Sequence, residues 1–143
     1  GGAGFLTPLA RGEGDDRMSG EELLFFDQHP GALPLYEAFV KRVLAEVDGI
    51  EIRVKKTQIS LANRRNFACV SFLPVRRAQD RPKDYLVITF SLESPVSSPR
   101  IDVVTEPYPQ RWTHHVLIAK PEEIDGELLE WVRQAASFSA RKR

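Results

Sequence analysis

The pattern of hydrophobic and polar residues changes period twice along this chain, and each change predicts a change of secondary structure. Between residues 34 and 47 apolar side chains recur every three or four positions, which places them on one stripe of a helix. From residue 50 onward apolar and polar residues alternate, a period of two that is typical of half-buried strands. After Asp125 the helical spacing returns. The pattern therefore predicts helices at both ends of the chain and strands between them.

Start and stop signals set the expected ends of the helices. Ser19, with Glu22 three residues later, forms a capping-box pattern, so a short helix should begin there and end before Pro30. Pro34 suits the first turn of the next helix, because its missing N–H costs nothing at that position. Gly49 is well placed to end that helix.

The strand pattern predicts one sheet. The expected strands cover residues 50–55, 58–61, 67–73, 85–92, 101–106 and 112–119. Consecutive strands with short connections pair antiparallel, since parallel neighbours need long crossovers. We therefore expect an α+β fold with a mostly antiparallel sheet of five or six consecutive strands. Two N-terminal helices and one C-terminal helix should cover one face, which leaves the other face partly polar.

The composition indicates one ordinary globular domain. The chain has 143 residues, of which 42% are hydrophobic and 28% are charged. We expect a flexible leader over residues 1–17, a single α+β domain over 18–139 and a frayed basic tail over 140–143. No apolar run approaches the ~18 residues that span a bilayer, so we expect no membrane contact. The lone cysteine, Cys69, and the absence of a secretory-signal pattern favour a cytoplasmic protein.

Charge is balanced overall but uneven along the chain. Lys and Arg together number 20, as do Asp and Glu. Residues 13–48 hold nine acids and three bases, whereas residues 53–83 hold nine bases and one acid, Asp80. Such a basic stretch can bind an anion or nucleic acid, or it can simply solvate a surface and neutralise the acidic segment. The sequence leaves these interpretations open.

Two short stretches resemble a known family. They are Lys-Thr-Gln-Ile-Ser-Leu at 56–61, with Arg65 and Phe67 following, and Thr-His-His-Val at 113–116, with Trp131 in the last helix. Both are similar to an uncharacterised bacterial domain-of-unknown-function family that is sometimes labelled "predicted transport protein". The resemblance covers roughly residues 34–137 and implies a compact α+β domain with no established activity. Ala136 departs from it, since an aromatic residue is expected there.

The histidines and the cysteine are the first candidates for chemistry. Adjacent strand residues point to opposite faces, so His114 and His115 are unsuited to binding one metal together. His114 shares its face with Val116 and should be buried, whereas His115 should lie on the polar face and is free to bind or to carry a proton. Cys69 lies in the middle of a strand, where we expect it to be buried and inert. One cysteine and three scattered histidines predict no metal site, and without a phosphate-binding glycine loop we expect no cofactor.

The leading functional hypothesis is a non-catalytic binding module that presents a basic, polar sheet surface to an anionic ligand or a protein partner. The residues predicted to bind are Lys56, Thr57, Arg64, Arg65 and His115, because charge-assisted hydrogen bonds from such groups hold phosphates and carboxylates. One alternative is nucleic-acid binding through residues 53–83. The other is a small enzyme that uses His115 as its acid or base.

Overall fold

The computed structural model describes residues 19–141. The predicted leader and the last two residues of the predicted tail, 142–143, lie outside this range. The last helix continues through Arg141, the final described residue.

Three helices and six strands form the domain. The helices are α1 (Gly20–Phe25), α2 (Leu33–Glu46) and α3 (Gly126–Arg141). Single 3-10 turns lie at η1 (Pro30–Ala32), η2 (Ala78–Asp80) and η3 (Pro121–Glu123). The strands are β1 (Glu51–Val54), β2 (Gln58–Ala62), β3 (Asn66–Ser71), β4 (Leu86–Leu92), β5 (Val103–Tyr108) and β6 (Arg111–Ile118).

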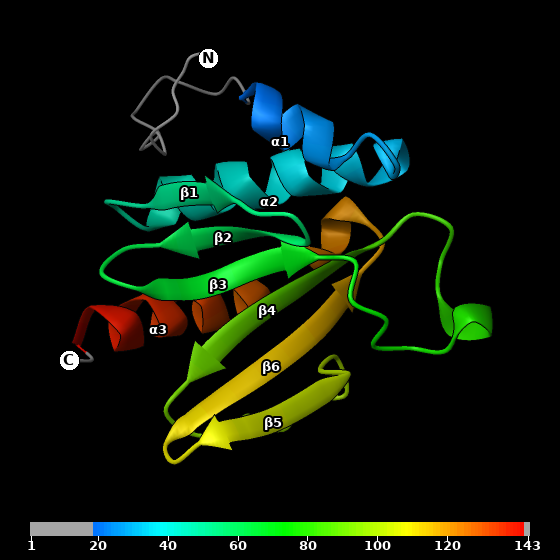
Figure 1. Ribbon diagram of the computed structural model, residues 1–143. Helices are drawn as coiled ribbons and strands as arrows, with labels where there is room; N and C mark the ends of the chain where they lie inside the picture. Colours follow the sequence, from blue (N-terminus) through cyan, green and yellow to red (C-terminus); the bar gives the residue numbers. More distant parts are fainter. Residues whose placement is uncertain (1–18, 142–143) are drawn as a thin grey trace.

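The strands form one antiparallel sheet in the order β1-β2-β3-β4-β6-β5. Figure 1 shows the sheet from its open face, with α3 behind the central strands and α2 behind the β1 edge. The predicted α+β class, the antiparallel pairing and the two N-terminal helices and one C-terminal helix are confirmed.

The order of the last two strands differs from their order in the sequence. β6 pairs with β4, and β5 forms the outer edge beyond β6. The connection over residues 93–102 therefore has to pass β6 before β5 begins. Two contacts hold this connection in place: the Val96 N–H donates to Nε2 of His114 at 3.0 Å, and the Arg100 guanidinium pairs with Asp125 at 2.8 Å.

The register decides which side chains face the helices. His114 lies opposite Phe90 and is completely buried, with its ring stacked on Phe90 at a centroid distance of 5.0 Å. His115, one residue on, faces the other way and lies opposite Thr89 on the open face. The expectation that the two histidines occupy opposite faces is confirmed.

Helix α1 is fixed to the core by a buried acid. The predicted capping box is present: Glu22 N–H donates to Oγ of Ser19, and Ser19 N–H donates to Oε1 of Glu22. The other carboxylate oxygen of Glu22 accepts a short hydrogen bond from the Tyr36 hydroxyl of α2. Both carboxylate oxygens of this buried acid accept hydrogen bonds, and these fix the position of α1 beside α2. Phe25, at the end of α1, is thereby held against the sheet.

Candidate functional site

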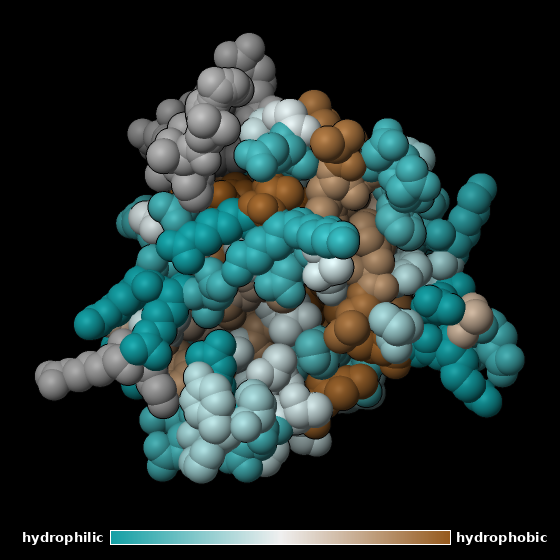
Figure 2. All heavy atoms as spheres, in the orientation of Figure 1, coloured by the Kyte–Doolittle hydropathy of each residue, from teal (hydrophilic) through white to brown (hydrophobic). Residues whose placement is uncertain are grey.

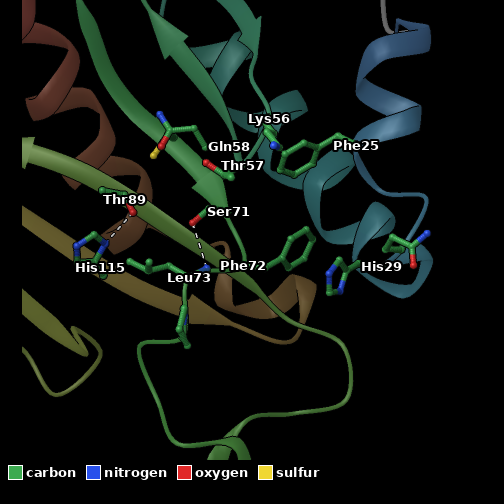
Figure 3. A pocket seen from close by; sticks show the side chains of 13 residues that line it. Phe25, His29, Lys56, Thr57, Gln58, Ser71, Phe72, Leu73, Thr89 and His115 are labelled. Carbon is green, nitrogen blue, oxygen red and sulfur yellow. Dashed lines mark hydrogen bonds between the residues drawn. The ribbon is translucent and has the colours of Figure 1, made fainter.

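A pocket opens where β3 ends and runs onto the open face of the sheet (Figure 3). Its volume is about 530 Å³, a size typical of small-molecule sites. Side chains from the α1–η1 segment, the β1–β2 turn, the end of β3 and the strands β4 and β6 line it. They are Phe25, Gln28, His29, Lys56, Thr57, Gln58, Cys69, Ser71, Phe72, Leu73, Pro74, Thr89 and His115.

The polar end of the pocket is a row of three residues on neighbouring strands. Cys69 lies opposite Thr89, and Thr89 lies opposite His115. Residues directly opposite each other in antiparallel strands point to the same face, so the three side chains stand side by side. Oγ1 of Thr89 is 2.8 Å from Nδ1 of His115, a hydrogen bond that fixes the plane of the imidazole.

Burial changes the acidity of both titratable groups in this row. Burial lowers the pKa of His115, and the nearby His114 lowers it further, so this imidazole is neutral near pH 7. Burial raises the pKa of the Cys69 thiol, although a hydrogen bond with Thr89 and the charge of Lys55 act in the opposite direction. The thiol is therefore protonated near pH 7 and is a poor nucleophile.

Cys69 differs in one respect from the sequence-based expectation. It is half-buried and lines the pocket, whereas a fully buried position was expected. The reason is that it points to the open face, which no helix covers at this place. Its predicted low reactivity agrees with the raised pKa.

The other end of the pocket is aromatic. Phe72 stacks on His29 at 3.8 Å and on Phe25 at 5.9 Å between ring centroids, each with an interplanar angle of 19°. We call Phe25, His29 and Phe72 the aromatic wall. Beside it, Leu73 leaves 45% of its surface exposed. Figure 2 shows hydrophobic side chains gathered on this face below α1, with hydrophilic side chains on both sides of them.

The charge of the lining is small and positive. Lys56 is the single lysine or arginine among the described lining residues, and these include no aspartate or glutamate. Lys56 and Thr57 come from the exposed turn between β1 and β2, which a hydrogen bond from Lys55 N–H to the Gln58 carbonyl closes at 2.8 Å. An anion that enters the pocket therefore meets a cation and hydrogen-bond donors, and no carboxylate of the described residues.

The structure brings together three of the five residues that the sequence analysis singled out. Lys56, Thr57 and His115 all line the pocket. Arg64 and Arg65 lie in the β2–β3 turn at the opposite end of β2. At ~3.3 Å per residue, the length of β2 separates the two groups by roughly 20 Å. One small ligand cannot contact both.

The turn that carries the two arginines is docked on α3. The Asn63 side-chain amide donates to the Ala136 carbonyl at 2.8 Å, and the Arg65 N–H donates to Oγ of Ser139 at 3.2 Å. Both arginine side chains are exposed, and the backbone around them is tied to the helix. This turn therefore has a structural role that the sequence does not reveal.

Sequence reasoning missed the aromatic wall and Thr89. Phe25 and Phe72 read as ordinary core positions of a helix and a strand, and 46 residues separate them in the chain. Only the packing of α1 against the end of β3 brings their rings together. Thr89 has a local signal, since it alternates with Ile88 and Phe90 on the polar side of its strand, but nothing local links it to His115.

Two searches of residues 19–141 concern metal ligands and membrane-spanning helices. Among residues 19–141 no group of three or more His, Cys, Asp or Glu side chains is arranged to hold a metal ion. Over the same range, no helix combines the length and the apolar character that a membrane span requires.

Comparison with known proteins gives a family. The profile of the family described as domain of unknown function DUF5655 matches residues 22–139. The chain belongs to this family. No curated protein and no solved structure matches. The matched range of DUF5655 runs from the buried Glu22 of α1 to Ser139 of α3, so it includes every residue that lines the pocket.

Proposed function

We propose that this DUF5655 domain is a non-catalytic binding module that takes a small anionic ligand into the pocket at the end of β3. The observation that carries the proposal is the convergence of Lys56, Thr57 and His115, which come from the β1–β2 turn and the distant strand β6. Lys56 supplies the positive charge, and the hydroxyl and imidazole groups supply hydrogen bonds. Pockets that combine an apolar wall with a few convergent polar groups are typical small-molecule sites.

The chemistry of the row Cys69–Thr89–His115 favours binding over catalysis. A protonated thiol is a weak nucleophile, and the imidazole is held by Thr89 and not by a carboxylate. The described lining residues also include no carboxylate that would orient the imidazole as the acid of a catalytic triad does.

The test is a titration of the ¹⁵N-labelled protein with acetate, benzoate and inorganic phosphate, followed by amide chemical shifts. The amides of residues 56–58 and 115 should move on addition of at least one anion. Lys56→Met should weaken this binding by about two- to fivefold, the worth of an exposed ion pair. Lys41→Met is the matched control, because Lys41 is an exposed lysine of α2, behind the sheet, and does not line the pocket.

The result also decides between the two halves of the site predicted from sequence. The double variant Arg64→Ala/Arg65→Ala should bind as the wild type does, since these side chains lie at the far end of β2. Anion-induced shifts that were absent, or equally strong in K56M and in wild type, would contradict the proposal.

A second candidate is an acid–base enzyme centred on His115. The hydrogen bond from Thr89 and the lowered pKa favour it, since a neutral, oriented imidazole is a competent general base near pH 7. Turnover of p-nitrophenyl esters that H115F abolishes would support this candidate. Equal rates in both proteins would count against it.

Nucleic-acid binding through residues 53–83 has weaker support. The basic side chains of this stretch are divided among β1, the two ends of β2 and the loop before β4. Three of them also have carboxylate partners: Arg53 pairs with Glu51, Arg76 with Asp102 and Arg77 with Asp80. Fluorescence anisotropy with labelled DNA and RNA at two salt concentrations tests this candidate, because such binding weakens steeply with salt.

A further inference from the structure

We propose that the anion taken by this pocket is a carboxylate of a protein partner, presented by an amphipathic helix with acidic residues along one flank. The carboxylate would lie at Lys56, and the apolar side of the helix would cover the aromatic wall and the leucines beside it. This inference rests on the proposed function and names the partner of the same pocket. Three features of the molecule support it: the apolar surface around the pocket, the backbone at the end of β3 and the charges on either side.

The apolar surface extends beyond the pocket. Leu24 of α1 and Leu73 at the end of β3 leave 72% and 45% of their surface exposed. The stacked rings of Phe25 and Phe72 connect them, since Leu24 precedes Phe25 and Leu73 follows Phe72. We call these four residues the apolar strip, and Figure 2 shows hydrophobic side chains from α1 downward on this face. A small anion would leave most of the strip in water, and exposed apolar surface of this kind marks protein-binding sites.

The backbone beside the apolar strip selects a helical partner. β3 lies between β2 and β4, so it has no free edge to which an extended peptide could add. Beyond β3 the Leu73 N–H donates to Oγ of Ser71 at 3.4 Å, and the Leu73 carbonyl accepts the Val75 N–H at 2.8 Å. The Phe72 carbonyl accepts the Tyr85 hydroxyl at 3.4 Å. With these groups engaged, a partner has to satisfy its own backbone, as a helix does, and amphipathic helices bind apolar surfaces through side chains three and four positions apart.

The charges around the apolar strip select acids on one flank of that helix. Lys56 lines the pocket beside Phe25 (Figure 3), and the exposed Lys55 precedes it in the β1–β2 turn. Neither lysine forms an ion pair with a carboxylate of residues 19–141. On the α1 side the exposed side chains of Glu21 and Asp27 are acidic. The acids of the partner therefore belong on the flank that faces the β1–β2 turn, where a basic helix would be repelled.

The experiment uses four synthetic peptides of about four helical turns, labelled for fluorescence anisotropy. The first has leucines three and four positions apart and glutamates along one flank. The second has lysines in place of the glutamates, the third has alanines in place of the leucines, and the fourth is the first with a proline at its centre, which breaks the helix. The first peptide should bind about tenfold or more tightly than each of the others, because each lacks one of the three selected properties.

Three variants assign the binding to the apolar strip and to the turn. Leu24→Gln and Leu73→Gln should each weaken binding of the acidic peptide about three- to tenfold, the worth of covering half of a leucine side chain. Leu24→Gln should leave acetate binding unchanged, since Leu24 does not line the pocket. Lys56→Met should weaken binding of the peptide and of acetate alike, by about two- to fivefold. Tyr108→Gln is the control for the two leucines, because Tyr108 is as exposed as Leu73 but lies on β5, outside the pocket.

The outcomes separate this inference from the proposed function. If small anions shift the amides of residues 56–58 but the acidic peptide binds no more tightly than acetate, the inference is wrong and the proposed function stands. If the basic or the proline peptide binds as tightly as the acidic helix, the charge or the helix assignment is wrong. If L24Q and L73Q weaken the peptide no more than Tyr108→Gln does, the apolar strip is not the contact. If neither the small anions nor the acidic peptide binds, the proposed function fails together with the inference.

Discussion

The buried His114 should make the stability of this domain depend on pH. Its Nε2 accepts the Val96 N–H at 3.0 Å, so its proton is on Nδ1, which is buried without a partner among the described residues. Burial lowers the pKa of His114 below its ordinary value, although the backbone of Phe90 and Trp112 acts in the opposite direction. Protonation would break the bond to Val96 and place a charge in the core, beside Phe90. The folded state therefore resists a proton that the unfolded chain accepts.

The sign and the size of the effect follow from this difference. Below about pH 6.5 the unfolded chain binds a proton at this histidine and the folded chain does not, so the free energy of unfolding falls as the pH falls. At about pH 5.5 the loss is at most ~1.4 kcal/mol for one such group. His115, whose pKa is also lowered, adds a smaller loss because it is partly exposed.

The perturbation is His114→Phe, which keeps a ring stacked on Phe90. It leaves the Val96 N–H without its acceptor, which costs about 1–3 kcal/mol, and it removes the unpartnered Nδ1–H, which returns a similar amount. We expect stability at about pH 7.5 to be close to that of the wild type, and the loss between about pH 7.5 and 5.5 to be roughly half as large or less.

The assay is urea unfolding followed by tryptophan fluorescence at three pH values across this range, for wild type, H114F and H115F. The double variant H114F/H115F should show a nearly flat profile. A wild-type stability that does not fall with pH, or an H114F protein with the full wild-type loss, would refute the reasoning.

Two further predictions concern residues near the pocket. Cys69 should react with iodoacetamide more slowly in the folded than in the unfolded protein near pH 7, because burial raises its pKa. Thr89→Val should slow the reaction of the folded protein further, because it removes a hydrogen bond that lowers this pKa. Equal rates in the folded and unfolded proteins would contradict this. Gly31→Ala should stabilise the Asp84→Ala protein by about 0.4–1 kcal/mol, because alanine restricts the unfolded chain. It should stabilise the wild type less, since the exposed Asp84 carboxylate has to move away from the new methyl group. Thermal unfolding of the four proteins measures this, and an equal effect of Gly31→Ala in both backgrounds would rule out the contact.

The local sequence pattern was sufficient to predict the helices and strands and the face of the sheet on which each strand side chain lies. The capping box of Ser19 and Glu22 places α1, and the three- and four-residue spacing places α2. Because side chains alternate along a strand, the sequence also assigns His114 to the core and His115 to the open face. Even the separation of Arg64 from Lys56 follows from the length of the strand between them.

The sequence by itself therefore determined what depends on near neighbours: the helices, the strands, their antiparallel pairing and the face of each side chain. Only the tertiary structure decided that β6 lies between β4 and β5, because strand order depends on contacts such as Val96 with His114. It also decided the pocket. Phe25, Phe72 and His115 come from a helix end, a strand end and a distant strand. Their proximity is a result of packing, and no period along the chain encodes it.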